Sequence, residues 1–171
     1  MSTLAAIIAF DQRLAQALLP LRELRWLRIG AKLTSIVFAG PVCFLLYAAS
    51  YLAFSELREL LHLILLAEAF QLGLIALLRN MTRRTRPAGA EKLIYYPRWN
   101  RYSFPSLHAS RSAMLCLAVS LFYSWPFVLL APLAALCAAS RLLLQKHFLT
   151  DVLCGATIGL LASFLSAALL S

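Results

Sequence analysis

Long runs of apolar residues, separated by short polar junctions, fill the chain from residue 29 onward. A helix that crosses a bilayer needs about 20 mostly apolar residues in succession. The pattern predicts five such helices, near residues 29–53, 57–78, 106–122, 124–141 and 148–170. Their connections are short, so neighbouring helices should run antiparallel, as in an up-and-down bundle. The expected fold class is all-α, an integral membrane helix bundle.

The first 27 residues follow a different pattern. Leu and Ile recur there at helical spacing, but Asp11, Gln12 and Arg13 interrupt them. An apolar stripe opposite charged residues is typical of a helix that lies in the membrane interface. We therefore expect residues 1–27 to form an amphipathic interfacial helix, with a sixth membrane span as the alternative. We do not expect a cleaved signal peptide, because no positive charge precedes the apolar stretch.

Composition agrees with a membrane protein. The chain has 171 residues, of which 62% are hydrophobic, and its mean hydropathy is +0.80, well above that of ordinary soluble domains. No repeat, low-complexity segment or long linker divides it. We expect one membrane-embedded domain over residues 1–171, with the helix bundle at 29–171.

The net charge of +9 is unevenly distributed. When the predicted helices are threaded through a bilayer, nearly all Lys and Arg fall on one face, and the other face holds only Arg58, between Glu56 and Glu59. These cations border apolar and aromatic residues and belong to no nucleic-acid-binding motif, so nucleic acid is not the expected partner. Anionic membrane lipids fit this pattern better.

The clearest chemistry lies in the run SRLLLQKHFLTD, residues 140–151. It places Arg141, His147 and Asp151 in a sequence that is otherwise mostly hydrocarbon. Ionisable groups are costly in a membrane, so such a cluster predicts a functional site. On a helix, His147 and Asp151 would share one face. The carboxylate would then hold one ring nitrogen and leave the other to act as a nucleophile or base.

Two other polar runs precede this one. RNMTRRTRP places Arg79 six residues before the pair Arg86-Pro87, and PSLH occupies residues 105–108. The three runs together resemble the signature of the type 2 phosphatidic acid phosphatase superfamily of lipid phosphate phosphatases, which is Lys-x6-Arg-Pro, Pro-Ser-Gly-His and Ser-Arg-x5-His-x3-Asp. The resemblance covers residues 79–151 in the family's order, and the third run matches at every fixed position.

The resemblance implies a membrane enzyme that dephosphorylates a lipid phosphate or pyrophosphate. His147 would attack phosphorus to form a phosphohistidine, and Asp151 would orient it. His108 would protonate the departing lipid oxygen and then activate water. The phosphate-binding residues would be Arg79, Arg86, Ser106, Leu107 and Arg141, because arginines donate to phosphate in pairs of hydrogen bonds and a helix N-terminus favours an anion. No cofactor or metal ion is expected, since the arginines supply its charge.

The chain departs from the family pattern at two positions. Arg79 replaces Lys, which keeps the charge but changes its shape. Leu107 replaces Gly, and its side chain would crowd a close approach of the backbone to phosphate. We expect these departures to affect the substrate range more than activity itself.

Several other polar residues invite two interpretations. Arg111, one helical turn after His108, would either contact a second phosphate or headgroup, or extend to the interface. Glu68 and Gln71 lie mid-span, too far from Arg79 to reach its phosphate, and favour a hydrogen bond inside the bundle over a proton pathway. Arg83 and Arg84 receive no specific role. Five aromatic residues between the first two motifs would form an interfacial belt, a wall that guides lipid, or both: Tyr95, Tyr96, Trp99, Tyr102 and Phe104.

Other functions stay open at this point. A lipid phosphotransferase would use the same residues with an alcohol as acceptor, and a non-catalytic protein would use the cations alone to bind anionic lipid. Candidate substrates are phosphatidate, phosphatidylglycerol phosphate and polyprenyl phosphates or pyrophosphates. We expect a multi-pass location in the cytoplasmic (inner) membrane. Many relatives that the resemblance implies work on the extracytoplasmic side, whereas the charge distribution favours a site that faces the cytoplasm.

Overall fold

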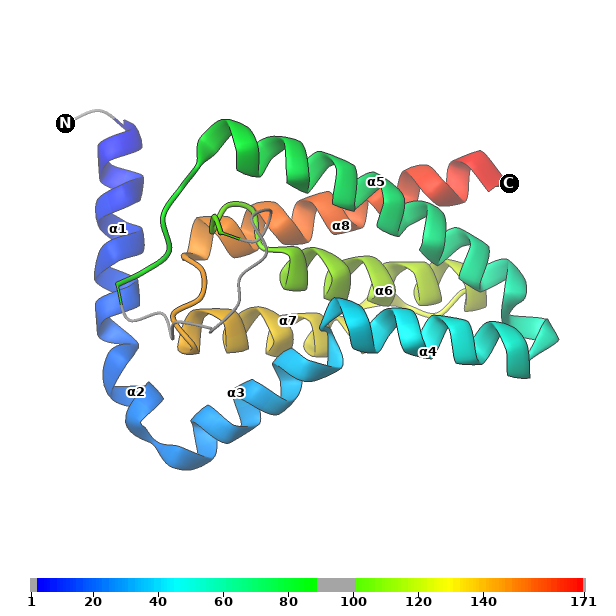
Figure 1. Ribbon diagram of the computed structural model, residues 1–171, viewed down its shortest axis with the longest axis horizontal. Helices are drawn as coiled ribbons and strands as arrows, with labels where there is room; N and C mark the ends of the chain where they lie inside the picture. The colour runs from blue at the N-terminus through cyan, green and yellow to red at the C-terminus, as the bar shows by residue number, and fades with distance from the viewer. Residues whose placement is uncertain (1–2, 89–100, 171) are drawn as a thin grey trace.

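The computed structural model describes residues 3–88 and 101–170 (Figure 1). In this part of the chain the secondary structure is helical, which confirms the all-α prediction. The helices are α1 (Thr3–Ala17), α2 (Leu19–Glu23), α3 (Arg25–Val37), α4 (Gly40–Ala53), α5 (Arg58–Thr82), α6 (Leu107–Tyr123), α7 (Phe127–Leu143) and α8 (Leu149–Leu170), with a 3-10 turn at Ser55–Leu57.

The helices from α4 to α8 run side by side, and α1 lies crosswise at one end of them (Figure 1). The largest interface joins α6 to α8, and α5 packs against both. A core cluster of buried side chains joins α4, α5, α6 and α8, with Ala67, Met114 and Ala118 fully enclosed. Residues 83–88 after α5, residues 101–106 before α6 and the turn between α7 and α8 lie at the end covered by α1 (Figure 1).

The predicted helix at 29–53 is two helices. α3 and α4 meet at a bend of 48°. Pro41 lies in the first turn of α4, and Ala39 before it is extended at φ −71° and ψ 140°. Proline has no backbone N–H to continue a helix and suits a first turn, so a new helix begins here. The predicted span is therefore broken at residues 38–39, although the bent pair together is still long and apolar enough to count as one candidate span.

The N-terminal segment is also more broken than predicted. In place of one helix over residues 1–27, the chain forms α1 and α2 and enters α3 at Arg25. Leu24 is extended, at φ −69° and ψ 107°, and separates α2 from α3. Among the described residues, α1 is not one of the helices long and apolar enough to cross a membrane. Its crosswise placement fits the expected interfacial helix better than a sixth span (Figure 1).

By length and composition, two helical stretches can cross a membrane: Ser55–Thr82 and Leu149–Leu170. The α3–α4 pair makes a third if it is one broken span. α6 and α7 are apolar but have 17 residues each, and they lie within three residues of the predicted 106–122 and 124–141. Large apolar side chains cover the outside, as at Leu45, Leu52 and Val128, which are 71%, 83% and 71% exposed. Such a surface needs hydrocarbon around it.

Two glycines let α8 lie directly against α6. A Cβ atom at Gly159 would stand 2.0 Å from the carbonyl oxygen of Ser110, and one at Gly155 would stand 2.3 Å from that of Ser106. Both contacts are with backbone, which cannot swing aside. The close approach carries the first turn of α8 to the start of α6, where the second and third motifs meet.

We therefore expect Gly159→Ala to push the two helices apart. Overpacking of this kind costs about 1–3 kcal/mol of unfolding free energy. Gly73→Ala is the matched control, because a Cβ at Gly73 meets nothing within 4 Å and Ala favours a helix by up to about 1 kcal/mol. Thermal unfolding in detergent should show a lower midpoint for Gly159→Ala and an unchanged or higher one for Gly73→Ala. Equal midpoints would contradict the packing argument.

Candidate active site

The connection between α5 and α6 brings the first two motifs together. α5 ends at Thr82, and the next residue, Arg83, has the left-handed φ of 46°. Ser103 then fastens the two ends of the connection: its N–H donates to the carbonyl of Arg84 at 2.9 Å, and its hydroxyl to that of Thr85 at 3.0 Å. Three residues of the expected aromatic belt lie outside the described residues: Tyr95, Tyr96 and Trp99.

His147 lies in the turn between α7 and α8. The prediction that His147 and Asp151 share a helix face was wrong, because α8 begins at Leu149. Asp151 causes this boundary: its Oδ2 accepts the backbone N–H of Phe148 at 2.9 Å, as a carboxylate does in a capping box. Gln145, at φ 57°, turns the chain just before.

The hydrogen bonds of His147 define its reactive nitrogen. Nδ1 lies 2.7 Å from the carbonyl oxygen of Ser103. A carbonyl oxygen only accepts, so Nδ1 carries the proton, and Nε2 of the neutral ring keeps its lone pair. A guanidinium nitrogen of Arg86 lies 3.4 Å from Nε2. His147 is 3% exposed. The hydrogen bond to Ser103 therefore holds a buried ring in the tautomer that a nitrogen nucleophile needs.

Asp151 acts on this ring at a longer distance than the spacing predicted. Its Oδ2 lies 3.7 Å from Nδ1 of His147, beyond hydrogen-bond range. The carbonyl of Ser103 takes the place expected for the carboxylate, and Asp151 can influence the ring through its charge. Its predicted role in orienting His147 stays a prediction.

Backbone carbonyls hold two of the predicted phosphate-binding arginines. Nε and a terminal nitrogen of Arg79 donate to the carbonyl of Pro105 at 3.3 and 3.0 Å. Arg86 donates to the carbonyl of Lys146 at 2.6 Å and to that of Tyr102 at 3.3 Å. Arg79 thus hydrogen-bonds to the second motif, at Pro105, and Arg86 to the segment of the third motif, at Lys146.

The third arginine completes the cluster. Arg141 is buried and donates to the hydroxyl of Ser35 in α3. Burial, followed by the charges of Arg141, Arg86 and Arg79, lowers the pKa of His147 well below 6.5. The structure therefore brings the three predicted cations near one imidazole, and burial together with their charges favours its neutral form.

The start of α6 lies beside this cluster. Ser106 is its N-cap: the hydroxyl accepts the N–H of Ala109 at 3.5 Å, and the backbone N–H donates to the carbonyl of Asp151 at 2.9 Å. Leu107 is buried in a small cluster with Ile75 and Ile158, on α5 and α8. The side chain that replaces glycine therefore packs in the core. Because the Leu107 side chain packs against Ile75 and Ile158, this position does not support the expected crowding between Leu107 and a bound phosphate.

His108 occupies the first turn of α6 and is half-buried. It lies close enough to His147 and Arg141 for their charges to interact, and its carbonyl accepts from the thiol of Cys137 on α7 at 3.5 Å. A second imidazole thus stands near the predicted nucleophile, as the motif requires.

Arg111 lies in the interior. It is 1% exposed, forms a buried ion pair with Glu68 and donates to the carbonyl of Phe38 at 3.2 Å. Gln71 and Tyr47 also donate to Glu68, at 2.8 and 3.4 Å. This confirms the expected hydrogen bonding of Glu68 inside the bundle. Arg111 does not reach an interface, and its predicted contact with a headgroup gains no support from this position.

Sequence reasoning missed two residues at the site. Arg84, which received no role, donates to Oδ1 of Asp151 at 2.7 Å and to Oδ2 of Asp11 at 2.7 Å. Asp11 was taken as part of the polar face of an interfacial helix, yet it is 1% exposed. The sequence does contain a sign of this: Asp11 is a carboxylate inside an apolar helix. In a membrane protein such a group usually pairs with a cation or a hydrogen-bond donor.

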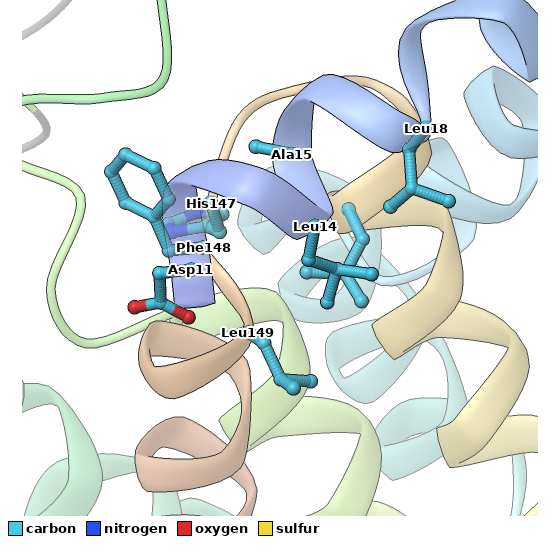
Figure 2. A pocket seen from close by; sticks show the side chains of 8 residues that line it. Asp11, Leu14, Ala15, Leu18, His147, Phe148 and Leu149 are labelled. Atoms are coloured by element: carbon cyan, nitrogen blue, oxygen red, sulfur yellow. The ribbon is translucent and has the colours of Figure 1, made fainter. Parts of the chain in front are cut away.

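A narrow crevice beside His147 lies between α1 and the turn from α7 to α8. Figure 2 shows the side chains that line it. Its walls are mostly apolar and include Leu14 of α1, Leu18 just after α1, Leu142 of α7 and Leu149 of α8. α1 therefore forms one wall of the space next to the imidazole.

Comparison with known proteins identifies the family. A sequence model of the PAP2 superfamily matches residues 57–171, which include all three motifs. The chain belongs to the PAP2 superfamily. The type 2 phosphatidic acid phosphatase resemblance of the motifs is thereby confirmed, and family membership supports a lipid phosphatase.

Two solved structures share the fold. One is a transmembrane PAP2-type phosphatidylglycerolphosphate phosphatase from Bacillus subtilis, with a TM-score of 0.81 and 24% identity over 96% of this chain and 86% of that one. The other is LpxE from Aquifex aeolicus, with a TM-score of 0.71 and 21% identity over 95% of each chain. Together with the apolar helices, these folds identify an integral membrane protein.

The lowered pKa of His147 leads to a pH prediction. His147 should remain neutral through pH 6.5, where a free histidine is half protonated. Because the unfolded chain binds this proton first, His147 should contribute stability at neutral pH that falls as the pH drops below 6.5. Histidine NMR in detergent measures the titration directly. Arg141→Gln should raise the pKa of His147 toward 6.5, and a wild-type pKa at or above 6.5 would contradict this electrostatic account.

Proposed function

We propose that this PAP2 protein hydrolyses a membrane lipid phosphate or pyrophosphate through a phosphohistidine on His147. One observation carries the proposal: a neutral, buried imidazole with its lone pair on Nε2 lies among three arginines. The arginines can neutralise a transferring phosphoryl group, while Nε2 is available for attack.

The reaction has two balanced steps. Nε2 of His147 bonds to phosphorus as the phosphorus–oxygen bond to the lipid breaks, and His108 gives its proton to the departing oxygen. Water then attacks the phosphohistidine, and His108 takes a proton from it, which restores both histidines and releases phosphate. For a monoester, the sum is lipid phosphate plus water giving lipid alcohol plus phosphate.

The substrate class follows from the surroundings of the site. The apolar outer surface gives access from the bilayer, and the cations at one end favour an anionic headgroup. Phosphatidate, phosphatidylglycerol phosphate and polyprenyl phosphates or pyrophosphates all fit this description. No metal ion is part of the proposed chemistry, because the guanidiniums of Arg79, Arg86 and Arg141 would stabilise the transferring charge.

Phosphate release from a panel of these lipids in detergent tests the function. We expect wild type to hydrolyse at least one of them and His147→Ala to lose turnover, by about 10³-fold or more as for other covalent nucleophiles. His108→Ala should also stop turnover but retain acid-labile, base-stable phosphate on His147. His62→Ala is the control, since His62 lies at the other end of α5. Full activity in His147→Ala would overturn the mechanism.

We further propose that the protein lies in the cytoplasmic membrane in several passes, with the site facing the cytoplasm. α2 and the start of α3, which carry Arg22 and Arg25, lie at the site's end of the bundle, and the start of α5, which carries Arg58, lies at the other (Figure 1). This distribution fits the positive-inside rule. A cysteine at the exposed position of Arg13, with the four native cysteines replaced, tests this orientation. It should resist a membrane-impermeant maleimide in intact cells and react after lysis. Labelling in intact cells would reverse the orientation.

A further inference from the structure

The N-terminal helix contacts the segment that carries His147 on both sides of that residue. Before it, the side-chain amide of Gln145 donates to the carbonyl of Ala15 at 2.9 Å. After it, Thr150 donates to Asp11 through its backbone N–H at 3.2 Å and through its hydroxyl. Figure 2 shows Asp11 and Ala15 of α1 on either side of His147. Residues 145–150 are therefore fastened to α1.

Asp11 serves the first turn of α8. Thr150 is the second residue of that helix, and the N–H groups of a first helical turn have no partner within the helix. Oδ1 of Asp11 accepts this N–H, and its negative charge is favourable at a helix N-terminus. α1 thus supplies a cap to α8 from a distant part of the sequence.

Arg84 joins Asp11 to the carboxylate of the third motif. One of its terminal nitrogens donates to Asp151 at 2.7 Å and to Thr150 at 2.6 Å, and the other donates to Asp11 at 2.7 Å. Both carboxylate side chains are 0% exposed, whereas that of Arg84 is 24% exposed. The guanidinium also stacks on the ring of Phe148, 4.3 Å from its centre. This geometry fixes Arg84 in one place between two buried carboxylates.

The charges of this bridge matter for the imidazole. Two ionised carboxylates and one guanidinium sum to one net negative charge, and Asp151 is the member nearest His147, at 3.7 Å. As Nε2 bonds to phosphorus, positive charge develops on the ring, and a fixed negative group beside Nδ1 stabilises it. If Asp11 were neutral, Arg84 would compensate Asp151 alone, and that stabilisation would weaken.

We propose that Asp11 and Arg84 are positioning residues for His147, which act through Asp151 and Thr150, and that α1 is part of the catalytic unit. This inference rests on the proposed function. It adds residues outside the three motifs to the reaction, and it assigns α1 a role beyond contact with the membrane.

The test compares variants of the purified full chain on the panel lipid that wild type hydrolyses fastest. Asp11→Asn keeps the shape of the side chain and removes its charge, and Arg84→Gln removes the bridge. Each should lower kcat on the order of 10-fold, the scale seen when a supporting partner of a reactive group is lost, while KM stays within about twofold. Gln12→Ala and Arg83→Gln, at exposed neighbouring positions, should match wild type.

The double variant distinguishes a shared bridge from independent damage. Asp11→Asn combined with Arg84→Gln should lose no more than about twofold beyond the worse single variant, because both act through one set of contacts. If Asp11→Asn does not fold, Thr150→Val decides, since it removes the linking hydroxyl and keeps the backbone N–H. Its kcat should fall with KM unchanged.

Three results would overturn the inference: single variants within twofold of wild type, losses that multiply in the double variant, or a rise in KM at constant kcat. If wild type releases no phosphate from any panel lipid, the proposed function fails instead. The two failures are therefore distinguishable in one series of measurements.

Discussion

The hydrogen bond from Nδ1 of His147 to the carbonyl of Ser103 decides what chemistry this end of the bundle can perform. It places the ring proton on one nitrogen and leaves the lone pair on the other, within 3.4 Å of Arg86. A carboxylate in the same place would favour a protonated ring, whereas a carbonyl does not add a full negative charge. Burial among cations reinforces the neutral form. The tautomer of the proposed nucleophile therefore depends on a backbone atom of the connection between α5 and α6.

That arrangement requires α6 and α8 to lie very close together. Gly155 and Gly159 remove the side chains that would separate them, so Ser106 can donate its N–H to the carbonyl of Asp151 at 2.9 Å. This contact sets the second motif against the third. The small residues of α8 are thus as much a part of the site's geometry as the charged ones, because they determine how near the two helix starts can come.

Two arginines outside the proposed phosphate-binding set bind buried carboxylates. Arg111 pairs with Glu68 inside the bundle, and Arg84 joins Asp11 to Asp151. A buried charge is tolerated when a partner and hydrogen bonds compensate it. These pairs join α5 to α6 and α1 to α8, so they add specific contacts to a bundle whose other contacts are mostly non-directional hydrocarbon packing.

The sequence by itself determined the helical class, the approximate positions of α5, α6, α7 and α8 and the family, because apolar periodicity and motif spacing are local properties. It also named the three arginines and two histidines that the fold brings near one another. Tertiary structure alone decided that Ser103 holds His147, that Leu107 packs into the core and that Arg84 and Asp11 contact the start of α8. Every residue has a backbone carbonyl, so the sequence gives no sign that the carbonyl of Ser103 will accept from His147. A contact between Asp11 and Thr150 spans 139 positions, so only the packing of α1 across the bundle end creates it.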